Sequence, residues 1–382
     1  MAATAVEAAE AQAAKAQIGA DVRITGLEAI PLRIPYRVPW ENLHTTRAGA
    51  RREWLHTVVL RLRAGGLVGL GEVPGGPDVA RDLVGRALPA LQGLTPLAIA
   101  PALARLDAAL GPERAAWRAG LEFALHDLAG RALGVPLYQL LGGKARARVP
   151  LAYTMGMRPL DQLAAEAQAA ASRGFRHCIK LKVGAGDDLD YVLAVARAVP
   201  DVPVRPDSNC GHDKAEAARL LRAMLDAGVR LELVEDPCPT DWEDYAGLAD
   251  TFGVQLSVHG QMRGPADVLD LLRRGRGIAA ANLDPYRWGI RGLVQAAGAL
   301  EYAGIGAMMG TSHATGIKTA VELHLAAAVQ NLRFPSDIIG PLVLAGDVLQ
   351  TPLDLSTGDA PPPEGPGLGV DLAAAALARW AA

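Results

Sequence analysis

The sequence has few cysteines, almost no net charge and no long hydrophobic run. Cys178, Cys210 and Cys238 are too few and too odd in number for a disulfide framework, and no CxxC pair indicates a zinc site. The 38 Lys and Arg residues against 41 Asp and Glu give a net charge of −3, which argues against a nucleic-acid-binding protein. Apolar stretches such as 338–346 are about half the roughly 18 residues that a membrane span requires. We therefore expect a cytoplasmic α/β protein with no nucleic-acid or membrane partner.

The first third of the 382-residue chain combines a short tail with strand and then helix patterns. Residues 1–20 are rich in alanine and lack the basic start and apolar core of a secretory signal, so we expect a disordered tail or a loosely docked helix. Strand patterns follow at 22–30, 57–63 and 68–72. Helical periodicity then runs from about 79 to 133, so residues 21–145 are predicted to form an α+β domain.

From residue 146 onward, short apolar segments alternate with amphipathic helical ones. The predicted strands are 149–153, 178–183, 202–207, 231–235, 254–258, 278–284 and 305–309. Strand alternating with helix is typical of a parallel sheet, and seven or eight such units in about 200 residues favour a closed barrel over 146–350. The loop-rich tail, 351–382, is expected to pack back on the first domain. No GxGxxG motif joins a strand to a helix, so a dinucleotide site is not indicated.

Ionisable residues stand at the ends of five consecutive predicted strands. They are Lys182, Asp207, Glu235, His259 and Asp284, at spacings of 25, 28, 24 and 25 residues. Because catalysis in such barrels takes place at the carboxyl ends of the strands, a spacing of one βα unit predicts that all five side chains share one mouth. A chance alignment is the alternative, since strand ends are often polar.

The residue types at these strand ends favour acid–base and metal chemistry. Lys180 and Lys182 are two apart on a strand and face the same side, and like charges that close lower the pKa of at least one amine, which suits it to take a proton. Asp207 and Glu235 offer hard oxygen ligands for Mg2+ from adjacent strands, and Asn209 could contact a ligand. The alternatives are ion-paired lysines and carboxylates that cap helices or form ion pairs.

Seven short motifs are spread over nearly the whole chain. They are Ile179-Lys-Leu-Lys-Val-Gly184, Asp207-Ser-Asn209, Val234-Glu-Asp-Pro237, Gly66-Leu-Val-Gly-Leu-Gly-Glu72, Ala124-Leu-His-Asp-Leu-Ala-Gly130, Pro136-Leu-Tyr-Gln-Leu-Leu-Gly-Gly143 and Gly365-Pro-Gly-Leu-Gly369. In order and spacing they resemble the enolase superfamily, in the branch of mandelate racemase and muconate cycloisomerase. The resemblance implies a modified TIM barrel, (β/α)7β, with an α+β capping domain. It also implies removal of the proton α to a carboxylate, with Mg2+ at Asp207 and Glu235 stabilising the enediolate.

The chain departs from the family pattern at the fifth and sixth strand ends. The third metal ligand of the family, an Asp or Glu, falls on His259 or Gly260, so that carboxylate is missing. His259 could ligate a metal, although imidazole suits Zn, Fe or Ni better than Mg2+, and the alternative is a weakened or absent metal site.

At the sixth strand end, Asp284 stands where muconate-type members have a lysine and mandelate racemase has an aspartate that orients a histidine. His313 lies three residues beyond the position of that histidine. It is therefore either the partner of Asp284 in a dyad or a loop histidine that contacts backbone.

In this family, the loop after the first capping strand closes over the barrel and helps to select the substrate. Here it spans 39–53 and offers Trp40, His44 and Arg47 among several polar side chains. A loop this polar favours a hydroxylated or doubly charged acid, and the alternative is a solvated loop without ligand contact.

We predict an enolase-superfamily isomerase (a racemase, epimerase or cycloisomerase) that acts on a small polar carboxylic acid and forms homo-oligomers. Lys182 is the expected base, Lys180 would lower its pKa and neutralise the substrate carboxylate, and Asp284 with His313 would act on the opposite face. A dehydratase of a hydroxy or sugar acid is one alternative. A binding protein that kept the fold and lost the reaction is another, which the missing carboxylate favours.

Overall fold

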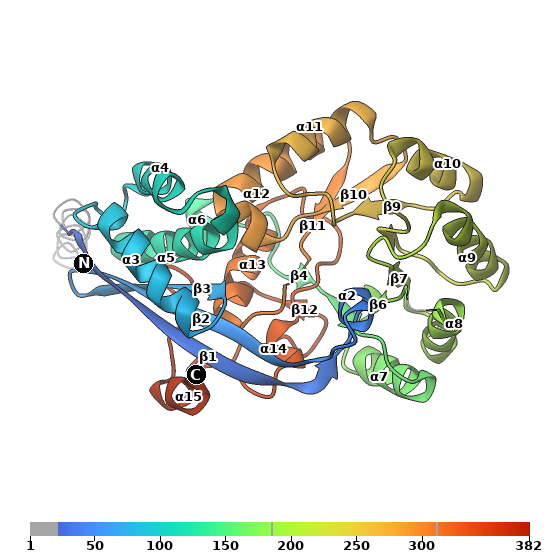
Figure 1. Ribbon diagram of the computed structural model, residues 1–382, viewed down its shortest axis with the longest axis horizontal. Coiled ribbons are helices and arrows are strands. Elements are labelled where there is room, and N and C mark those ends of the chain that lie inside the picture. The colour runs from blue at the N-terminus through green and yellow to red at the C-terminus, as the bar shows by residue number, and fades with distance from the viewer. Residues whose placement is uncertain (1–21, 185, 311) are drawn as a thin grey trace, which may run out of the picture.

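The computed structural model describes residues 22–184, 186–310 and 312–382, so the predicted tail at 1–20 lies outside the described residues. Figure 1 shows a small antiparallel sheet with its helices beside a ring of parallel strands surrounded by helices. The predicted α/β class, with a modified TIM barrel and an α+β capping domain, is confirmed. No helix in the described ranges is long and apolar enough to cross a membrane.

The capping part is a three-stranded sheet with helices packed on it. Its strands are β1 (Ile24–Trp40), β2 (Arg52–Ala64) and β3 (Leu67–Pro74), and its helices are α3 (Pro77–Leu91), α4 (Ile99–Leu110), the 3-10 turn η1 (Pro112–Arg114) and α5 (Ala115–Leu133). Leu60, Leu83 and Leu125 are fully buried in the core between them. Burial of one sheet face against amphipathic helices explains why the strand and helix patterns could be recognised in the sequence.

Strands β1 and β2 are much longer than the predicted strands at 22–30 and 57–63. They pair from Ile24 and Ala64 out to Trp40 and Arg52, and the outer half of this ribbon extends over the barrel (Figure 1). The outer half is partly exposed and carries Pro35, which an edge strand such as β1 tolerates. The buried Leu32, Ile34 and Tyr36 continue the apolar alternation of the strand. The prediction ended at residue 30 because prolines at 31, 35 and 39 are typical of strand breaks.

The tip of this ribbon contains a short helix where an irregular loop was expected. Helix α2 (Leu43–Arg47) begins at Asn42, whose side chain accepts a hydrogen bond from the Thr45 amide at 3.1 Å. Thr45 in turn accepts from the Asn42 amide at 2.8 Å, which completes a capping box. The Met157 amide donates to the Glu41 carbonyl at 3.0 Å, so the tip is fixed to the barrel mouth.

The barrel part contains seven parallel strands in sequence order. They are β5 (Ala152–Met155), β6 (Cys178–Lys182), β7 (Val204–Asp207), β8 (Val234–Glu235), β9 (Leu256–Val258), β10 (Ile278–Asn282) and β11 (Gly306–Met308). The helices outside them are α7 (Leu160–Ser172), α8 (Asp188–Ala198), α9 (Lys214–Asp226), α10 (Trp242–Phe252), α11 (Pro265–Arg274), α12 (Pro285–Tyr302) and α13 (Gly316–Ala328). Each predicted barrel strand overlaps an observed strand. Isolated bridges join Ala307 to Leu332 and Leu151 to Ser336, so segment 332–336 closes the ring at the eighth position.

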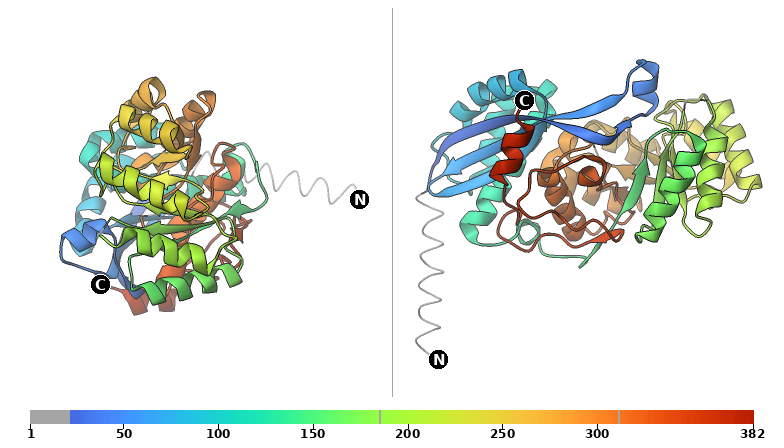
Figure 2. Two further views of the ribbon diagram at one scale, coloured as in Figure 1. Left: turned by 90° about the vertical axis from the view of Figure 1, so that its right-hand side faces the viewer. Right: turned by 90° about the horizontal axis from the view of Figure 1, so that it is seen from below.

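Segments from the tail lie against both parts of the molecule (Figure 2). Strand β12 (Asp359–Ala360) pairs with β4 (Val149–Pro150) at the barrel, and the Ala382 amide donates to Pro31 of β1 at 3.0 Å after helix α15 (Ala374–Trp380). The short helices α6 (Leu137–Leu140) and α14 (Gly340–Val343) complete the fold.

Two buried carboxylates from the motifs at 66–72 and 124–130 lie where the parts meet. Glu72 of β3 accepts from the amide and hydroxyl of Thr315 at 2.9 and 2.7 Å, and Thr315 caps α13 of the barrel. Asp127 of α5 accepts from the amides of Leu70 and Leu368, both at 2.7 Å, and so ties β3 to the tail. Buried carboxylates that accept several N–H and O–H groups fix the orientation of the segments they join.

Strand β3 crosses α5 so closely that Gly71 has no room for a side chain. A Cβ there would lie 2.1 Å from the carbonyl oxygen of Gly120. We predict that Gly71→Ala lowers the free energy of unfolding by about 1–3 kcal/mol through overpacking. Urea unfolding followed by circular dichroism measures it. Gly66→Ala, where nothing lies within 4 Å, is the control, and equal stability of the two variants would contradict the prediction.

Candidate active site

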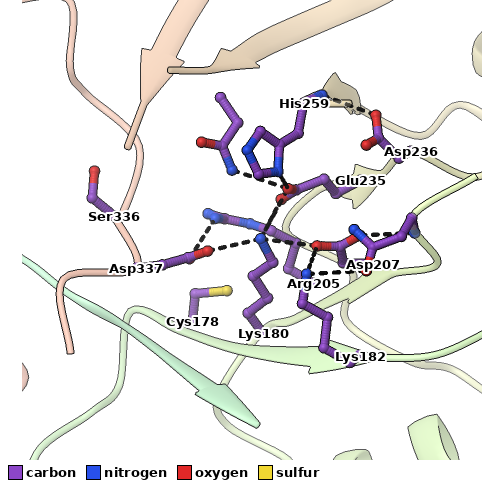
Figure 3. A network of polar contacts seen from close by, with 12 residues as sticks. Cys178, Lys180, Lys182, Arg205, Asp207, Glu235, Asp236, His259, Ser336 and Asp337 are labelled. Carbon is purple, nitrogen blue, oxygen red and sulfur yellow. Dashed lines mark hydrogen bonds and ion pairs between the residues drawn. The ribbon is translucent and has the colours of Figure 1, made fainter. Parts of the chain in front are cut away.

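The inward face of β6 carries both lysines of the predicted pair. Cys178, Lys180 and Lys182 alternate along the strand with Ile179 and Leu181, as the period of two in a strand requires. Lys182 pairs in register with Asp207 of β7, and Asp207 pairs with Glu235 of β8. Figure 3 shows that the basic and acidic side chains of these three strands point toward one another. The residues that the sequence placed at one mouth therefore do meet there.

Lys180 lies at the centre of three carboxylates. Its Nζ is 2.7 Å from Asp337 Oδ2, 2.8 Å from Glu235 Oε2 and 3.0 Å from Asp207 Oδ2, and the residue is 1% exposed. Burial acts to lower the pKa of Lys180, but the three carboxylates outweigh it and hold that pKa well above its usual value. Lys180 therefore stays protonated near neutral pH and cannot act as a base there.

Lys182 has a different environment, at the floor of the cavity. Its Nζ donates to Asp207 Oδ2 at 2.5 Å and to Asn209 Oδ1 at 3.3 Å. The side chain also lines the cavity described below, together with Asn209. Of the lysine pair, Lys182 therefore has the partners and the access that proton transfer to a bound molecule requires.

The two carboxylates that the sequence proposed as metal ligands are already bound by side chains. Asp207 Oδ1 accepts from the Asn209 amide at 3.0 Å, while Oδ2 faces both lysines. Glu235 Oε1 accepts from Lys180 and from Asn282 Nδ2, each at 2.9 Å. Burial alone would raise the pKa of Glu235, but the Lys180 ammonium and the His259 ring lower it well below its usual range.

His259 stands beside Glu235 at the end of β9, in the place of the missing carboxylate. Its Nδ1 lies 3.4 Å from Glu235 Oε1, and its amide donates to Asp236 Oδ1 at 2.9 Å. Among the described residues its Nε2 is buried without a hydrogen-bond partner. Across the described ranges, no three His, Cys, Asp or Glu side chains form a group that could hold a metal ion. Two carboxylates bound to an ammonium and one imidazole do not fit Mg2+, which prefers free oxygen ligands.

The backbone after β7 and β8 is strained where these residues lie. Asn209, Cys210 and Asp236 have φ angles of 47°, 59° and 45°, in the left-handed region that non-glycine residues seldom adopt. Such strain is concentrated at functional sites, where the surrounding structure enforces it. Here it turns Asp236 so that its carboxylate accepts the amides of His259 and Gly260 at 2.9 and 2.8 Å, which fixes the start of the loop after β9.

The structure gives Asp284 and His313 different partners. Asp284 accepts from the Ser312 hydroxyl and from the Tyr286 amide at 3.0 Å, and it lies 3.6 Å from the Lys318 ammonium. Burial raises the pKa of Asp284, but Lys318 and the hydrogen bonds lower it below its usual value. The predicted Asp284–His313 dyad is thus not formed in the described contacts.

His313 instead belongs to an aromatic group that comes from the capping ribbon. Its Nδ1 lies 3.2 Å from the Tyr36 hydroxyl, and its ring meets Trp40 edge-on with 4.2 Å between centroids. Burial, together with the positive charges of Arg52 and Lys182, lowers the pKa of His313 to about 3. The imidazole of His313 is therefore neutral near pH 7.

A cavity of about 540 Å3 lies between the capping loop and the barrel mouth. The predicted residues that line it are Trp40, His44, Lys180, Lys182, Asn209, His259 and His313. Asp207, Glu235 and Asp284 lie behind this lining, and the exposed Arg47 donates to the Gly211 carbonyl at 3.3 Å. The loop 39–53 thus closes over the barrel and supplies Trp40 and His44 to its wall.

Sequence reasoning missed two arginines at this site, Arg263 and Arg287. They line the cavity and donate to backbone oxygens of Gly260 and His259 at 3.0 and 3.3 Å. Arg52, one of the polar residues expected in the loop 39–53, lines the cavity as well. The positive charges of Arg263 and Arg287 are therefore not neutralised by these backbone contacts, which suits an anionic ligand.

Asp337 and Lys318 were also missed, although a signal existed for the first. Asp337 lies 28 residues after the end of the predicted strand at 305–309, which is one more βα unit. Lys318 lies on a helix, where strand-end spacing gives no signal.

Comparison with known proteins identifies the family. A sequence profile described as the mandelate racemase / muconate lactonizing enzyme N-terminal domain matches residues 34–142. A second profile, described as enolase C-terminal domain-like, matches residues 162–376. The chain belongs to the enolase superfamily. Both profiles place this enolase-superfamily chain in the mandelate racemase and muconate lactonizing enzyme branch, as the motifs predicted.

Relatives of this enolase-superfamily chain cover almost its full length. It is 31% identical to muconate cycloisomerase 1 of Rhodococcus opacus, over 94% of this chain and 99% of that protein. It is 30% identical to L-Lys-D/L-Arg epimerase of Methylococcus capsulatus, over 92% of this chain and 98% of that protein. Among solved structures, muconate lactonizing enzyme from Pseudomonas fluorescens in complex with muconolactone has a TM-score of 0.85 at 28% identity. The alignment covers 94% of this chain and 100% of the chain in that structure.

The neutral state of His313 predicts a pH dependence of stability. Its pKa is about 3 in the folded chain and about 6.5 when unfolded, so between these values the unfolded chain binds a proton that the folded chain does not. Stability should therefore fall as the pH falls through this window. In His313→Gln the loss between pH 7 and pH 5 should be smaller by about 1 kcal/mol, a value reduced for the partial exposure of the ring.

Urea unfolding at the two pH values measures this difference. His177→Gln is the control, because His177 is 41% exposed and pairs with Asp359 on the surface. If His313→Gln loses as much stability as the wild type, His313 is not held neutral in the folded protein.

Proposed function

We propose that this enzyme is a cycloisomerase-type isomerase that moves a proton on and off the carbon α to the carboxylate of a small acid. The observation that carries the proposal is the position of Lys182, a lysine held by Asp207 and Asn209 at the floor of a cationic cavity. The names of the relatives, muconate and chloromuconate cycloisomerases, support the same class of reaction.

The proposed step uses Lys182 as the proton carrier. In one direction its ammonium gives a proton to the α-carbon of an enediolate, so that an N–H bond breaks and a C–H bond forms. In the other direction the amine takes that proton back, and the carbon–hydrogen electron pair becomes the enediolate. Asp207 Oδ2 is 2.5 Å from the lysine nitrogen and holds it toward the cavity in both states. Because the donor set does not fit Mg2+, no step is assigned to a metal.

A single proton carrier favours a cycloisomerase over a racemase. A racemase requires a second acid–base group on the opposite face of the α-carbon. There, Asp284 is held by Ser312 and Lys318, and His313 is neutral and bound to Tyr36. Addition of an internal nucleophile across a double bond, followed by protonation, needs only one carrier.

An epimerase is the second candidate. His313 lines the cavity as a neutral imidazole, and one relative is named L-Lys-D/L-Arg epimerase. A dehydratase remains the alternative that the sequence left open, and cytoplasmic location, homo-oligomer formation and the predicted domain boundaries remain predictions.

The cavity wall favours an acid with a second anionic group. Arg52, Arg263 and Arg287 surround the space above Lys182, while Trp40 supplies an apolar wall. One cation is enough for one carboxylate, so three arginines beyond the lysines indicate further negative charge on the ligand.

The role of Lys182 is tested by proton exchange. We predict that wild-type protein incorporates deuterium from D2O into muconolactone, chloromuconolactone or another member of a panel of lactones and hydroxy acids, seen by proton NMR. Lys182→Met should lower that rate by about 10²–10⁴, the usual loss on removing a positioned acid or base.

Lys214→Met is the matched control, because Lys214 is exposed and forms its ion pair with Asp244 on the surface. It should exchange at the wild-type rate. Exchange that is unaffected in Lys182→Met would move the proton carrier to another residue. Inversion at the α-carbon without ring opening would favour the epimerase.

The cationic wall is tested by ligand binding. We predict that Arg263→Gln weakens binding of muconate, a dianion, by about tenfold, and that of a monocarboxylate such as sorbate much less, because only the dianion needs the additional charge. Isothermal titration calorimetry measures both affinities. Arg276→Gln, at a side chain that is 81% exposed, is the control. An equal loss for the two acids would mean that Arg263 does not face a second anionic group.

A further inference from the structure

The buried carboxylates at the barrel mouth each have a side-chain cation close by. Asp207, Glu235 and Asp337 are each at most 3% exposed. Facing them are three cations: the Lys180 ammonium bound to all three, the Lys182 ammonium on Asp207, and Arg205, whose Nη1 lies 3.5 Å from Asp337 Oδ1 (Figure 3). Arg205 also pairs with Glu232 at 2.8 Å, so these four carboxylates and three cations carry one net negative charge. A divalent ion would leave an excess of one positive charge, which is costly in a buried site.

Lys180 also occupies the space where a shared ion would have to sit. An ammonium has three N–H donors, and here there is one close carboxylate for each, at 2.7, 2.8 and 3.0 Å. An ion held between Asp207 Oδ2 and Glu235 Oε2 would contact the Lys180 nitrogen, since both oxygens lie within 3.0 Å of that nitrogen. Its entry therefore requires Lys180 to leave.

With His259 in the position of the third carboxylate, the site lacks one of the oxygen ligands that Mg2+ prefers. His259 contributes an imidazole, not a negative charge, and its Nδ1 lies 3.4 Å from Glu235 Oε1. Glu235 Oε1 accepts from Lys180 and Asn282, and Oε2 lies 2.8 Å from the same ammonium, so Lys180 already faces both oxygens of this carboxylate. A site with His259 in place of a carboxylate has one negative charge fewer. The single positive charge of the Lys180 ammonium therefore suits it better than the two charges of a divalent ion.

We infer that Lys180 takes the place of a divalent metal ion in this chain, as the fixed cation of the barrel mouth. The Lys180 ammonium, 3.0 Å from Asp207 and 2.8 Å from Glu235, holds these two carboxylates together and leaves Lys182 on Asp207 to face the ligand. This inference deepens the proposed function and rests on it only for the ligand that Lys182 faces. The binding of metal by the protein alone is a separate matter and can be measured without substrate.

The first experiment measures Mg2+ and Mn2+ binding to the wild-type protein by isothermal titration calorimetry and Mn2+ electron paramagnetic resonance. We expect no stoichiometric binding at millimolar concentrations and no change of melting temperature with either ion or with EDTA. One ion bound per chain and lost in Asp207→Asn would overturn the inference. Because no substrate is present, this result says nothing about the proton transfer assigned to Lys182.

The second experiment opens the site. Lys180→Met removes the ammonium but keeps a side chain of similar length, so two freed carboxylates should now bind Mn2+ weakly. Lys180→Met combined with His259→Asp supplies a third carboxylate and should bind Mg2+ at least tenfold more tightly than Lys180→Met alone, with a rise in melting temperature when the ion is added. Lys214→Met, at an exposed lysine, should behave like the wild type.

A further variant keeps the test decisive if Lys180→Met does not fold. His259→Asp alone restores the third carboxylate while Lys180 stays in place. If Lys180 excludes the ion, this variant should remain as indifferent to Mg2+ as the wild type. Mg2+ binding by His259→Asp as tight as in the double variant would show that His259, and not Lys180, decides the absence of binding, and would overturn the inference.

Discussion

The ion pairing of the Lys180 ammonium with three buried carboxylates organises the barrel mouth. Burying one of these charges alone would cost several kcal/mol, and a single mutual contact does not repay that cost. The cluster is tolerated because each carboxylate has an ammonium or guanidinium within 3.5 Å, and because the Asn209 amide and the Asn282 side chain donate to Asp207 Oδ1 and Glu235 Oε1. Strands β6, β7 and β8 and the closing segment at 332–336 are thereby drawn to one point.

The division of roles between the two lysines follows from their partners. Lys180 is surrounded by acids and is fixed as a cation. Lys182, one pleat further along the same strand, shares Asp207 with it but also reaches Asn209 and the cavity. Two residues of the same type on the same face therefore have different surroundings, one among three carboxylates and one between Asp207 and Asn209. Their identity and spacing alone do not reveal this difference.

The capping part completes the site by supplying its roof. The ribbon of β1 and β2 carries Tyr36, Trp40 and His44 over the barrel, and its tip is fixed by Glu41 and by the capping box of α2. The carboxylates of Glu72 and Asp127 hold the same sheet to α13 and to the tail. Cavity shape and charge thus depend on contacts between segments that fold as separate layers.

The strand–helix alternation and the period of two along β6 could be read from the sequence because both depend on local apolar patterns. They placed Lys180, Lys182, Asp207 and Glu235 together correctly, since strand ends one βα unit apart meet at one edge of a parallel sheet. The outer half of β1 escaped detection because prolines at 31, 35 and 39 are typical of strand breaks, although its buried Leu32, Ile34 and Tyr36 alternate regularly.

By itself the sequence determined the fold class, the family and the residues at the strand ends. The tertiary structure decided which of them pair. Lys180 meets Asp337 across 157 positions and His313 meets Tyr36 across 277, and such distant contacts exist only after the barrel closes and the ribbon folds over it. The choice between Asp284 and Tyr36 as partner of His313, and the contact of Lys180 with three carboxylates, depend on atomic distances that no local pattern encodes.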